Sequence, residues 1–393
     1  MQQQSNRLLA LDVLRGLTVA GMILVNNQGS WGSVFKPLSH AAWNGLTPTD
    51  LVFPFFMFIM GVSMFFSLRK YDFTFSRESA WKIFKRAVLI FFISIGINWF
   101  RILFSALCDI GNTDMTLAQR FTTHLFPFEN LRIPGVLQRL AISYFGAALI
   151  SLWVKPKQYW KVITGILLAY CVILFAGHGF VRNEQNVIGI VDRAVFGESH
   201  ILHTTSPEGV WFGFDPEGLL SSLPCFAHVL IGMFMGYVLV TIKDNGERIQ
   251  RLFIYGTVMA FAGLLFSYGC PINKKIWSPT FVLVACGFAS QLLALLIFVI
   301  DIKGCRRWSH AFEAFGVNPL FLYVLSEVLA IVLGAVCFYY QGDLISVKGF
   351  IYRVLLKSWL EPHWASLVYA LAYVALHWAV AEVLYRKRIY IKI

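Results

Sequence analysis

The chain has 393 residues, of which 58% are hydrophobic and only 14% are charged. Soluble domains carry roughly 25% charged residues, so this balance excludes an ordinary soluble protein and indicates that the lipid bilayer is its solvent. The formal net charge of +12 raises the question of nucleic-acid binding. The basic residues, however, lie in short clusters between apolar runs, which is the positive-inside pattern of membrane proteins. We therefore expect a bilayer and no nucleic acid as partner.

Ten apolar segments approach the roughly 20 residues that cross the hydrocarbon core as a helix. They lie near 10–28, 50–68, 84–104, 134–154, 160–178, 218–241, 251–269, 279–301, 316–340 and 364–385. The first should remain in the protein as a membrane helix, because MQQQSNR lacks the features of a cleaved secretory signal. The sequence therefore predicts an all-α transmembrane bundle of about ten spans, formed by a single domain over residues 1–393.

Five basic clusters fall on one side of this bundle if both termini are cytoplasmic. They are Arg69, Lys70, Arg77, Lys82, Lys85 and Arg86; Lys155, Lys157 and Lys161; Lys243, Arg248 and Arg251; Lys303, Arg306 and Arg307; and Arg386, Lys387, Arg388 and Lys392. The opposite loops are longer and more acidic, with Asp109, Asp114 and Glu129 in one and Glu184, Asp192, Glu198, Glu208, Asp215 and Glu217 in another. We expect those loops to be extracytoplasmic.

The segment 343–360 is apolar but would place the basic carboxyl terminus on the wrong side if it were a span. Lys348, Arg353 and Lys357 interrupt it, which favours an amphipathic helix at the membrane interface. An eleventh span is the alternative.

The seven cysteines show no CxxC or metal-ligand spacing, and we expect no metal. Most are expected to be small buried apolar residues. Cys108 and Cys270 should both lie near the extracytoplasmic face, where they could pair.

Asp12 and Arg15 lie three residues apart on one face of the first span. Ionisable residues at this depth pair with each other or face a polar cavity. An ion pair near the cytoplasmic interface explains them, and the functional alternative is that Arg15 holds the phosphates of an anionic cofactor.

The loop after the first span is dense in polar and aromatic residues. Asn26, His40, Trp43, Asn44 and Asp50 supply a base, amide donors and a carboxylate, which can polarise a carbonyl and accept a proton. A hydrogen-bonded structural role for an interfacial His is the alternative.

Other polar groups are expected at the same mouth. Arg132, Gln138 and Arg139 begin the fourth span; Asp215 and Glu217 precede the sixth; Asn273, Lys274, Lys275 and Trp277 follow the seventh. Helix capping by Asp215 and interfacial anchoring by Trp277 are simpler explanations. Gly232 and Gly236 have the GxxxG spacing of close helix packing, and Asn318 with Pro319 indicates a helix start or kink.

An ordered series of motifs along the chain resembles the heparan-α-glucosaminide N-acetyltransferase family. The motifs are LDVLRG, HAAWNGLTPTDLVFPFFMFIMG, RIPGVLQRLAISYF, FDPEGLLSSLP, PINKKIWSPTFVL and LYRKRIYIKI. This resemblance implies a membrane enzyme that moves an acetyl group from cytoplasmic acetyl-CoA to a glucosamine across the bilayer. It implies that His40 is the catalytic residue and that Asn26 matches the Asn of the preceding VN. Related enzymes are dimers, so we expect a homodimer.

The chain looks like a bacterial homologue of this family, so we expect the inner membrane, and an acceptor other than a lysosomal heparan terminus is open. His40 would act as a base or as an acetyl carrier, with Asn26 or Asn44 as donor. Arg15, Arg139, Asp50 and Trp43 are the predicted cofactor-binding residues. Asp215, Glu217, Asn273 and Lys274 are the predicted acceptor-binding residues.

Two rival functions use a similar amphipathic cavity. One is a transporter or flippase of a sugar or lipid-linked sugar, which the lack of a visible internal repeat disfavours. The other is an acyltransferase that acts on a cell-wall glycan.

Overall fold

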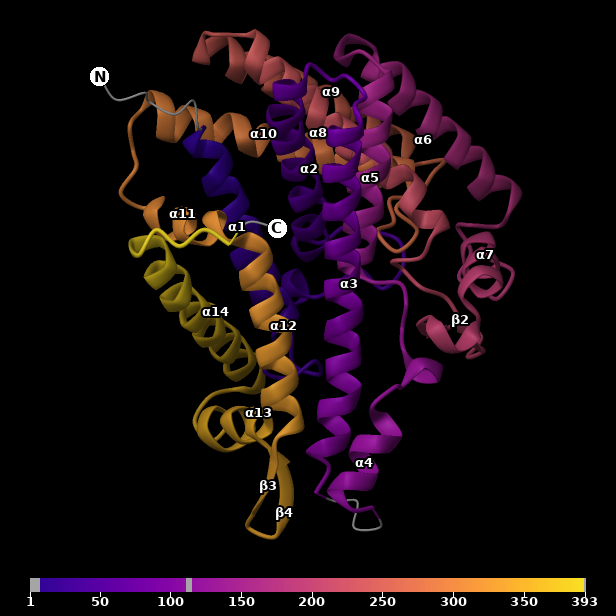
Figure 1. Cartoon of the computed structure of the whole chain (residues 1–393), viewed down its shortest axis with the longest axis vertical. Coiled ribbons are helices and arrows are strands. Elements are labelled where there is room, and N and C mark those ends of the chain that lie inside the picture. Colours follow the sequence, from indigo (N-terminus) through magenta and orange to yellow (C-terminus); the bar gives the residue numbers. More distant parts are fainter. Residues whose placement is uncertain (1–7, 111–114, 392–393) are drawn as a thin grey trace.

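The computed structural model describes residues 8–110 and 115–391, and the described part is built almost entirely of helices (Figure 1). The long helices are α1 (Leu9–Asn26), α2 (Pro48–Leu68), α3 (Arg77–Leu107), α5 (Val136–Trp153), α6 (Tyr159–Ala176), α8 (Leu223–Thr241), α9 (Asn245–Phe266), α10 (Pro279–Leu296, continued by a π-helical turn at Ile297–Ile302) and α14 (Pro362–Arg386). The shorter helices are α4 (Leu117–His124), α7 (Val187–Phe196), α11 (His310–Val317), α12 (Pro319–Ala335) and α13 (Val347–Phe350). Residues 1–7, Asp114 and Lys392, which entered the expectations above, lie outside the described ranges.

Hydropathy located the membrane spans well. Within the described residues, nine helical segments are long and apolar enough to cross a membrane, and α11 with α12 adds a tenth if this bent pair counts as one span. The third span, α3, is longer than the predicted 84–104, because a capping box between Ser76 and Ser79 starts the helix at Arg77. The predicted all-α, multi-pass architecture is confirmed.

The ninth predicted span, 316–340, was wrong at both ends. Pro319 starts α12 after an 84° bend from α11, since a proline has no N–H to continue the preceding helix. Asn318 fixes this bend to the end of the chain: its Nδ2 donates to Ile389 O at 2.9 Å, and its Oδ1 accepts from Ile391 N at 2.8 Å. The helix then ends at Ala335.

The apolar residues after α12 form a hairpin. Strand β3 (Cys337–Tyr340) pairs antiparallel with β4 (Asp343–Ser346), with Cys337 opposite Ser346. Gln341 and Gly342 both have positive φ, as a two-residue hairpin turn requires. The rest of 343–360 is α13 and a π-helical turn at Ile351–Leu356, and no described helix there is long enough to span. The expected helix is therefore present but short, and the eleventh span is not found.

A second small hairpin shapes the loop between α6 and α8. Strand β1 (His203–Thr205) pairs antiparallel with β2 (Trp211–Gly213). Phe212 and Phe214 join Tyr170 and Ile276 in a small hydrophobic cluster that is separate from the main core. This cluster joins the loop to α6 and to the segment between α9 and α10.

Glycines set the closest helix contacts. A Cβ on Gly232 of α8 would collide with Phe58 O of α2, and one on Gly61 of α2 would collide with Val229 O of α8. Gly236 faces Phe65 in the same interface, so the expected close packing of the GxxxG pair is confirmed.

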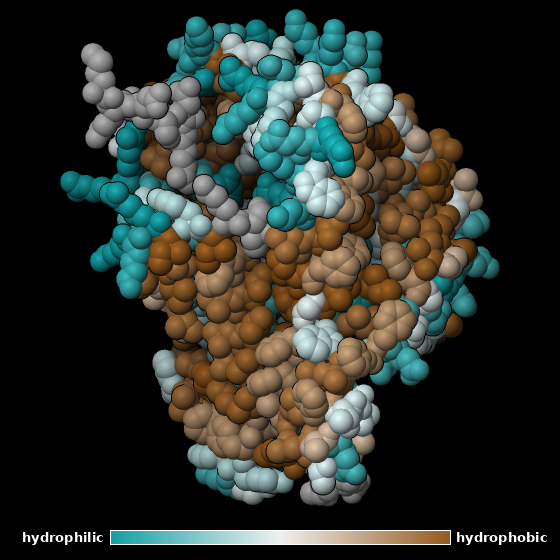
Figure 2. All heavy atoms as spheres, in the orientation of Figure 1, coloured by the Kyte–Doolittle hydropathy of each residue, from teal (hydrophilic) through white to brown (hydrophobic). Residues whose placement is uncertain are grey.

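Large apolar side chains cover the outside of several helices. Phe92 of α3, Trp160 of α6 and Phe261 of α9 are all exposed. Figure 2 shows hydrophobic residues over a broad band of one face, with hydrophilic residues gathered at the end where α9 and α10 lie in Figure 1. A protein in water rarely exposes so much apolar surface, and the chain is a multi-pass membrane protein.

The cysteines make no disulfide within the described structure. Cys108 lines a cavity together with Cys337 of β3, and Cys270 is buried elsewhere, between α9 and α10. The suggested pairing of Cys108 with Cys270 is therefore not found.

Candidate active site

The start of α2 is a capping box that fixes a carboxylate in place. Thr47 is the N-cap and Pro48 is the first helical residue, where its missing N–H costs nothing. The Thr47 side chain accepts from Asp50 N, and Asp50 Oδ2 accepts from Thr47 N at 3.1 Å. Asp50 is almost fully buried, so its position is set by the backbone of the helix end.

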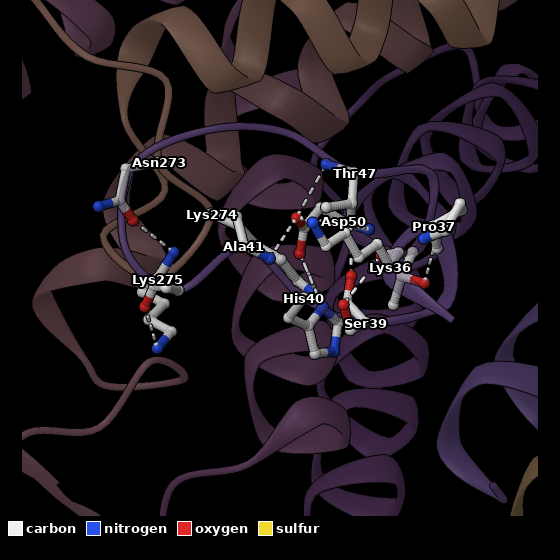
Figure 3. A network of polar contacts seen from close by, with 12 residues as sticks. Lys36, Pro37, Ser39, His40, Ala41, Thr47, Asp50, Asn273, Lys274 and Lys275 are labelled. Carbon is white, nitrogen blue, oxygen red and sulfur yellow. Dashed lines mark hydrogen bonds and ion pairs between the residues drawn. The ribbon is translucent and has the colours of Figure 1, made fainter. Parts of the chain in front are cut away.

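His40 binds this carboxylate directly. Its Nδ1 lies 2.7 Å from Asp50 Oδ1, while Asp50 Oδ2 accepts from Ala41 N at 3.1 Å and from the Thr47 hydroxyl at 2.9 Å (Figure 3). A carboxylate accepts hydrogen bonds, so the Asp50 contact favours a proton on Nδ1, and in the neutral ring this tautomer leaves the lone pair on Nε2. Nε2 makes no hydrogen bond within the described residues, and the His40 side chain is 48% exposed. This leaves His40 with a free basic nitrogen.

A second loop, between α9 and α10, is clamped to the His40 loop. Asn273 Nδ2 donates to Asn44 Oδ1 at 3.0 Å, and Gly45 N donates to Ile272 O at 2.8 Å. Asn273 Oδ1 also accepts from Lys275 N at 2.8 Å, which tightens the turn. Asn44 and Asn273, predicted to serve catalysis and the acceptor, thus bind each other, and the Asn44 amide nitrogen makes no hydrogen bond within the described residues.

The clamp brings Lys274 to His40. Its Nζ lies 3.2 Å from His40 Nδ1 and 3.7 Å from Asp50 Oδ1 (Figure 3). Burial lowers the pKa of Lys274, and the nearby Asp50 carboxylate partly offsets this effect. We call these three residues, His40, Asp50 and Lys274, the His40 site.

The predicted acidic residues Asp215 and Glu217 form an ion cluster with Arg132. Arg132 makes two bonds to Asp215, of 2.9 and 2.6 Å, and one of 2.6 Å to Glu217. Burial raises the pKa of Asp215, but the Arg132 bonds outweigh burial and hold that pKa below its usual range. Asp215 also accepts from Leu202 N, so its oxygens are occupied by the protein. The cluster holds the loops beside Lys274 in place.

The two arginines predicted to bind the cofactor lie in different halves of the bundle. Arg139 is buried, where it bonds to Ser221 and lies over the Trp277 ring at 5.0 Å. Trp43 is also engaged, since its Nε1 donates to Phe180 O at 2.8 Å. Neither residue reaches the cavity that contains Arg15.

Arg15 lines a cavity of about 430 Å³ at the other end of α2. Its guanidinium bonds to Asp12 at 2.9 Å and to Ser63 of α2 at 2.7 Å. Arg86 of α3 lines the same cavity and lies 5.1 Å over the Tyr144 ring. We call this the Arg15 cavity. The expected Asp12–Arg15 ion pair is therefore present, and it borders a cavity that Arg15 and Arg86 line.

Helix α2 runs from the His40 site to the Arg15 cavity. Phe53, Phe56, Met60 and Ser63 follow each other at spacings of three or four residues, which places them on one face of the helix, and Asp50 lies one turn before Phe53. At 1.5 Å per residue, the distance from Asp50 to Ser63 is about 20 Å along the helix axis.

Between these two ends the helices close on an apolar constriction. It is a cavity of about 10 Å³ lined by Met22, Phe53, Phe56, Val136, Leu137, Leu140, Leu320 and Tyr323. Phe56, Leu140 and Leu320 also line the Arg15 cavity, so the two spaces are adjacent. The lining comes from α1, α2, α5 and α12.

Asn26 is the last residue of α1, one turn beyond Met22 of the constriction. It is exposed, and its side chain makes no hydrogen bond within the described residues, including none to His40. Its predicted catalytic role stays a prediction.

Sequence reasoning missed several residues that shape these spaces. Ser63, Arg86 and Tyr323 were not singled out, although the three-to-four spacing from Phe53 along α2 leads to Ser63. Arg86 was counted only in a basic cluster, and Tyr323 stands in an unbroken apolar run.

The helices, the buried polar residues and the two cavities define an integral membrane protein with a His–Asp–Lys site at one end of its bundle. No protein-family model matches the chain. It is similar to two curated proteins named heparan-α-glucosaminide N-acetyltransferase. It is 28% identical to the mouse protein over 383 residues, which cover 84% of this chain and 54% of the relative. It is 27% identical to the human protein over 442 residues, which cover 98% of this chain and 60% of the relative.

This similarity supports membership of the heparan-α-glucosaminide N-acetyltransferase family. The chain spans somewhat more than half the length of each relative.

Proposed function

We propose that the chain is a transmembrane N-acetyltransferase that moves an acetyl group from acetyl-CoA to the amine of a glucosamine-type sugar. One observation carries the proposal: the same helix, α2, holds Asp50 beside a histidine whose Nε2 is free and, further along, lines an arginine-containing cavity. The names of the two relatives support the reaction class.

The Arg15 cavity suits the charged part of acetyl-CoA. Arg15 and Arg86 supply guanidinium groups for phosphate oxygens. The apolar constriction suits the thinner pantetheine arm, which must part its side chains to bring the thioester toward His40. Arg139 does not line this cavity, so Arg15 and Arg86 are the proposed phosphate ligands.

The acetyl transfer can then proceed at Nε2. The acceptor nitrogen attacks the thioester carbonyl and gives its proton to His40 Nε2, while Asp50 holds Nδ1–H and stabilises the imidazolium. The carbon–sulfur bond breaks, and the proton passes from Nε2 to the CoA sulfur. Asn26 or the free amide nitrogen of Asn44 would donate to the carbonyl oxygen as it becomes negative.

A covalent route uses the same nitrogen. His40 Nε2 would attack the thioester, CoA would leave, and the acceptor amine would then take the acetyl group from the ring. Isolation of acetyl-His40 in the absence of acceptor would favour this route. A requirement for a ternary complex, with no adduct, would favour direct transfer.

The basic clusters support a sidedness for the proposed reaction. They favour the cytoplasm at the Arg15 end of α2, and the His40 site would then be extracytoplasmic. Acetyl-CoA would then enter from the cytoplasm and reach across the bilayer. A homodimer in a bacterial inner membrane stays a prediction.

Replacement of His40 tests the function. We expect His40→Ala to lower acetyl transfer to glucosamine by roughly 10²–10⁴-fold, since a general base contributes about that much. The variant should still be stabilised by CoA in a thermal-shift assay, because the Arg15 cavity is intact.

A second histidine provides the control. His363 also pairs with an acid, with its Nδ1 2.8 Å from Glu361, and is similarly exposed. His363→Ala should retain transfer. Full activity of His40→Ala would overturn the proposal, and stabilisation by sugars but not by CoA would favour a transporter.

A further inference from the structure

The position of Lys274 does not suit the acceptor-binding role that was predicted for it. Its Nζ lies on the Nδ1 side of the His40 ring, 3.2 Å from that nitrogen, whereas the free nitrogen Nε2 is on the opposite side. The Lys274 side chain is mostly buried and lies against Asp50 Oδ1 at 3.7 Å. An acceptor at Nε2 would therefore not meet this ammonium.

Asp50 can accept few further hydrogen bonds, so it is poorly able to support a His40 ring that is protonated on both nitrogens. Its Oδ2 already accepts from Ala41 N, Thr47 N and the Thr47 hydroxyl, so His40 and Lys274 share Oδ1. When the His40 ring is neutral, the negative charge of Asp50 balances the positive charge of Lys274. A second proton on the ring would leave the site with a net positive charge.

The charges around this trio do not change that balance. Glu217, in the loop before α8, and Arg139, on α5, act on Lys274 in opposite directions. Lys275 is turned away: its Nζ donates to Ala42 O at 2.7 Å and lies 6.0 Å from the centre of the Trp43 ring. Lys274 is the cation closest to His40 in the described structure.

We propose that Lys274 is a positioning residue that keeps the resting His40 ring neutral, with its proton on Nδ1 and the Nε2 lone pair ready for the acceptor amine. This inference rests on the proposed function. Lys274 exchanges no proton itself. It opposes the imidazolium that forms during transfer and so promotes delivery of that proton to the CoA sulfur.

The test compares Lys274→Met with Lys274→Arg across a pH series. Loss of the ammonium leaves Asp50 alone beside the ring, which favours the imidazolium, so the acid limb of the rate profile should move up by about one pH unit. Lys274→Arg keeps the positive charge, so the acid limb of its rate profile should lie at the wild-type pH. Lys275→Met removes a neighbouring charge and should leave the limb in place. If Lys274→Met does not fold, Lys274→Gln is the second variant that removes the positive charge.

A second measurement does not depend on turnover. Diethyl pyrocarbonate modifies neutral imidazole, and mass spectrometry of the His40 peptide follows this one residue. At the pH where wild-type modification is half-maximal, Lys274→Met should react about fivefold more slowly, as a shift of one pH unit requires.

The outcomes separate the two proposals. Unchanged modification and an unchanged acid limb in Lys274→Met would overturn the role of Lys274, as would an equal shift in Lys275→Met. A shifted modification profile in a protein that transfers no acetyl group would support the coupling of Lys274 to His40 and reject the proposed function.

Discussion

Asp50 has two tasks at the level of single residues. It closes the capping box of α2 and it orients His40, using a different carboxylate oxygen for each task. Stability and activity therefore depend on the same side chain, and a substitution must be chosen to separate the two effects.

We expect Asp50→Asn to lower the transfer rate by roughly 10²-fold or more. An amide in place of the carboxylate no longer stabilises the imidazolium and can turn its NH₂ group toward the ring, which favours the wrong tautomer. The measurement is the turnover number for acetyl transfer at saturating substrates.

Thr47→Ala is the matched control for the cap. It removes the cap hydroxyl, which costs about 1 kcal/mol of stability, and leaves the Asp50–His40 bond in place. It should lower the apparent melting temperature yet keep much more activity than Asp50→Asn. Equal losses of activity would indicate that Asp50 acts only through the helix cap.

The sequence could predict part of this site. The crowding of Asn26, His40, Asn44 and Asp50 into one loop indicated chemistry there, and the motif series singled out His40. The sequence could not show that Asp50 binds His40, because the capping geometry of α2 brings these two residues together across ten positions of the chain. Lys274 is 234 residues away, and only the clamp between Asn44 and Asn273 brings it to the ring.

At the level of elements, α2 positions both cavities, and its contact with α8 fixes it. That contact depends on the absence of side chains at Gly61 and Gly232. Backbones at this separation leave no room for a methyl group, so the interface cannot adapt by a change of rotamer.

We expect Gly232→Ala to destabilise the protein by about 1–3 kcal/mol, because its Cβ would collide with Phe58 O and force α2 away from α8. Thermal unfolding in detergent measures this loss. Gly96→Ala on α3 is the control, since a Cβ there has nothing within 4 Å and alanine favours helix. Equal stability of the two variants would contradict the proposed packing.

Hydropathy and helix propensity explain why most elements were predictable and one was not. Apolar length locates a span, but it does not describe the path of the chain. The bend at Asn318 depends on its bonds to Ile389 and Ile391, and β3 continues the run of hydrophobic residues that forms the helix before it. Periodicity cannot distinguish a short apolar strand from a helix end.

For the whole molecule, the His40 site lies at the start of α2, and the Arg15 cavity, which adjoins the constriction, lies toward the other end of that helix. Basic loops predict which end faces the cytoplasm. The sequence alone could not show the constriction, because its lining comes from four helices that are far apart along the chain.

Oriented vesicles test this arrangement. In sealed vesicles with the Arg15 end outward, external acetyl-CoA should acetylate only amino sugar that is enclosed in the lumen. Vesicles of the opposite orientation should require acetyl-CoA inside and amino sugar outside. Radiolabelled acetyl measures the product, and detergent should abolish the difference. Transfer with both substrates outside intact vesicles would contradict a reaction across the membrane.

The bend between α11 and α12 has a practical consequence for protein engineering. Ile391 bonds to Asn318 and also lines the Arg15 cavity, so the segment that follows α14 is part of a cavity wall. A purification tag or fluorescent fusion attached there would pull on the bend and on the cavity together. Such a reporter would alter the site whose occupancy it was meant to monitor.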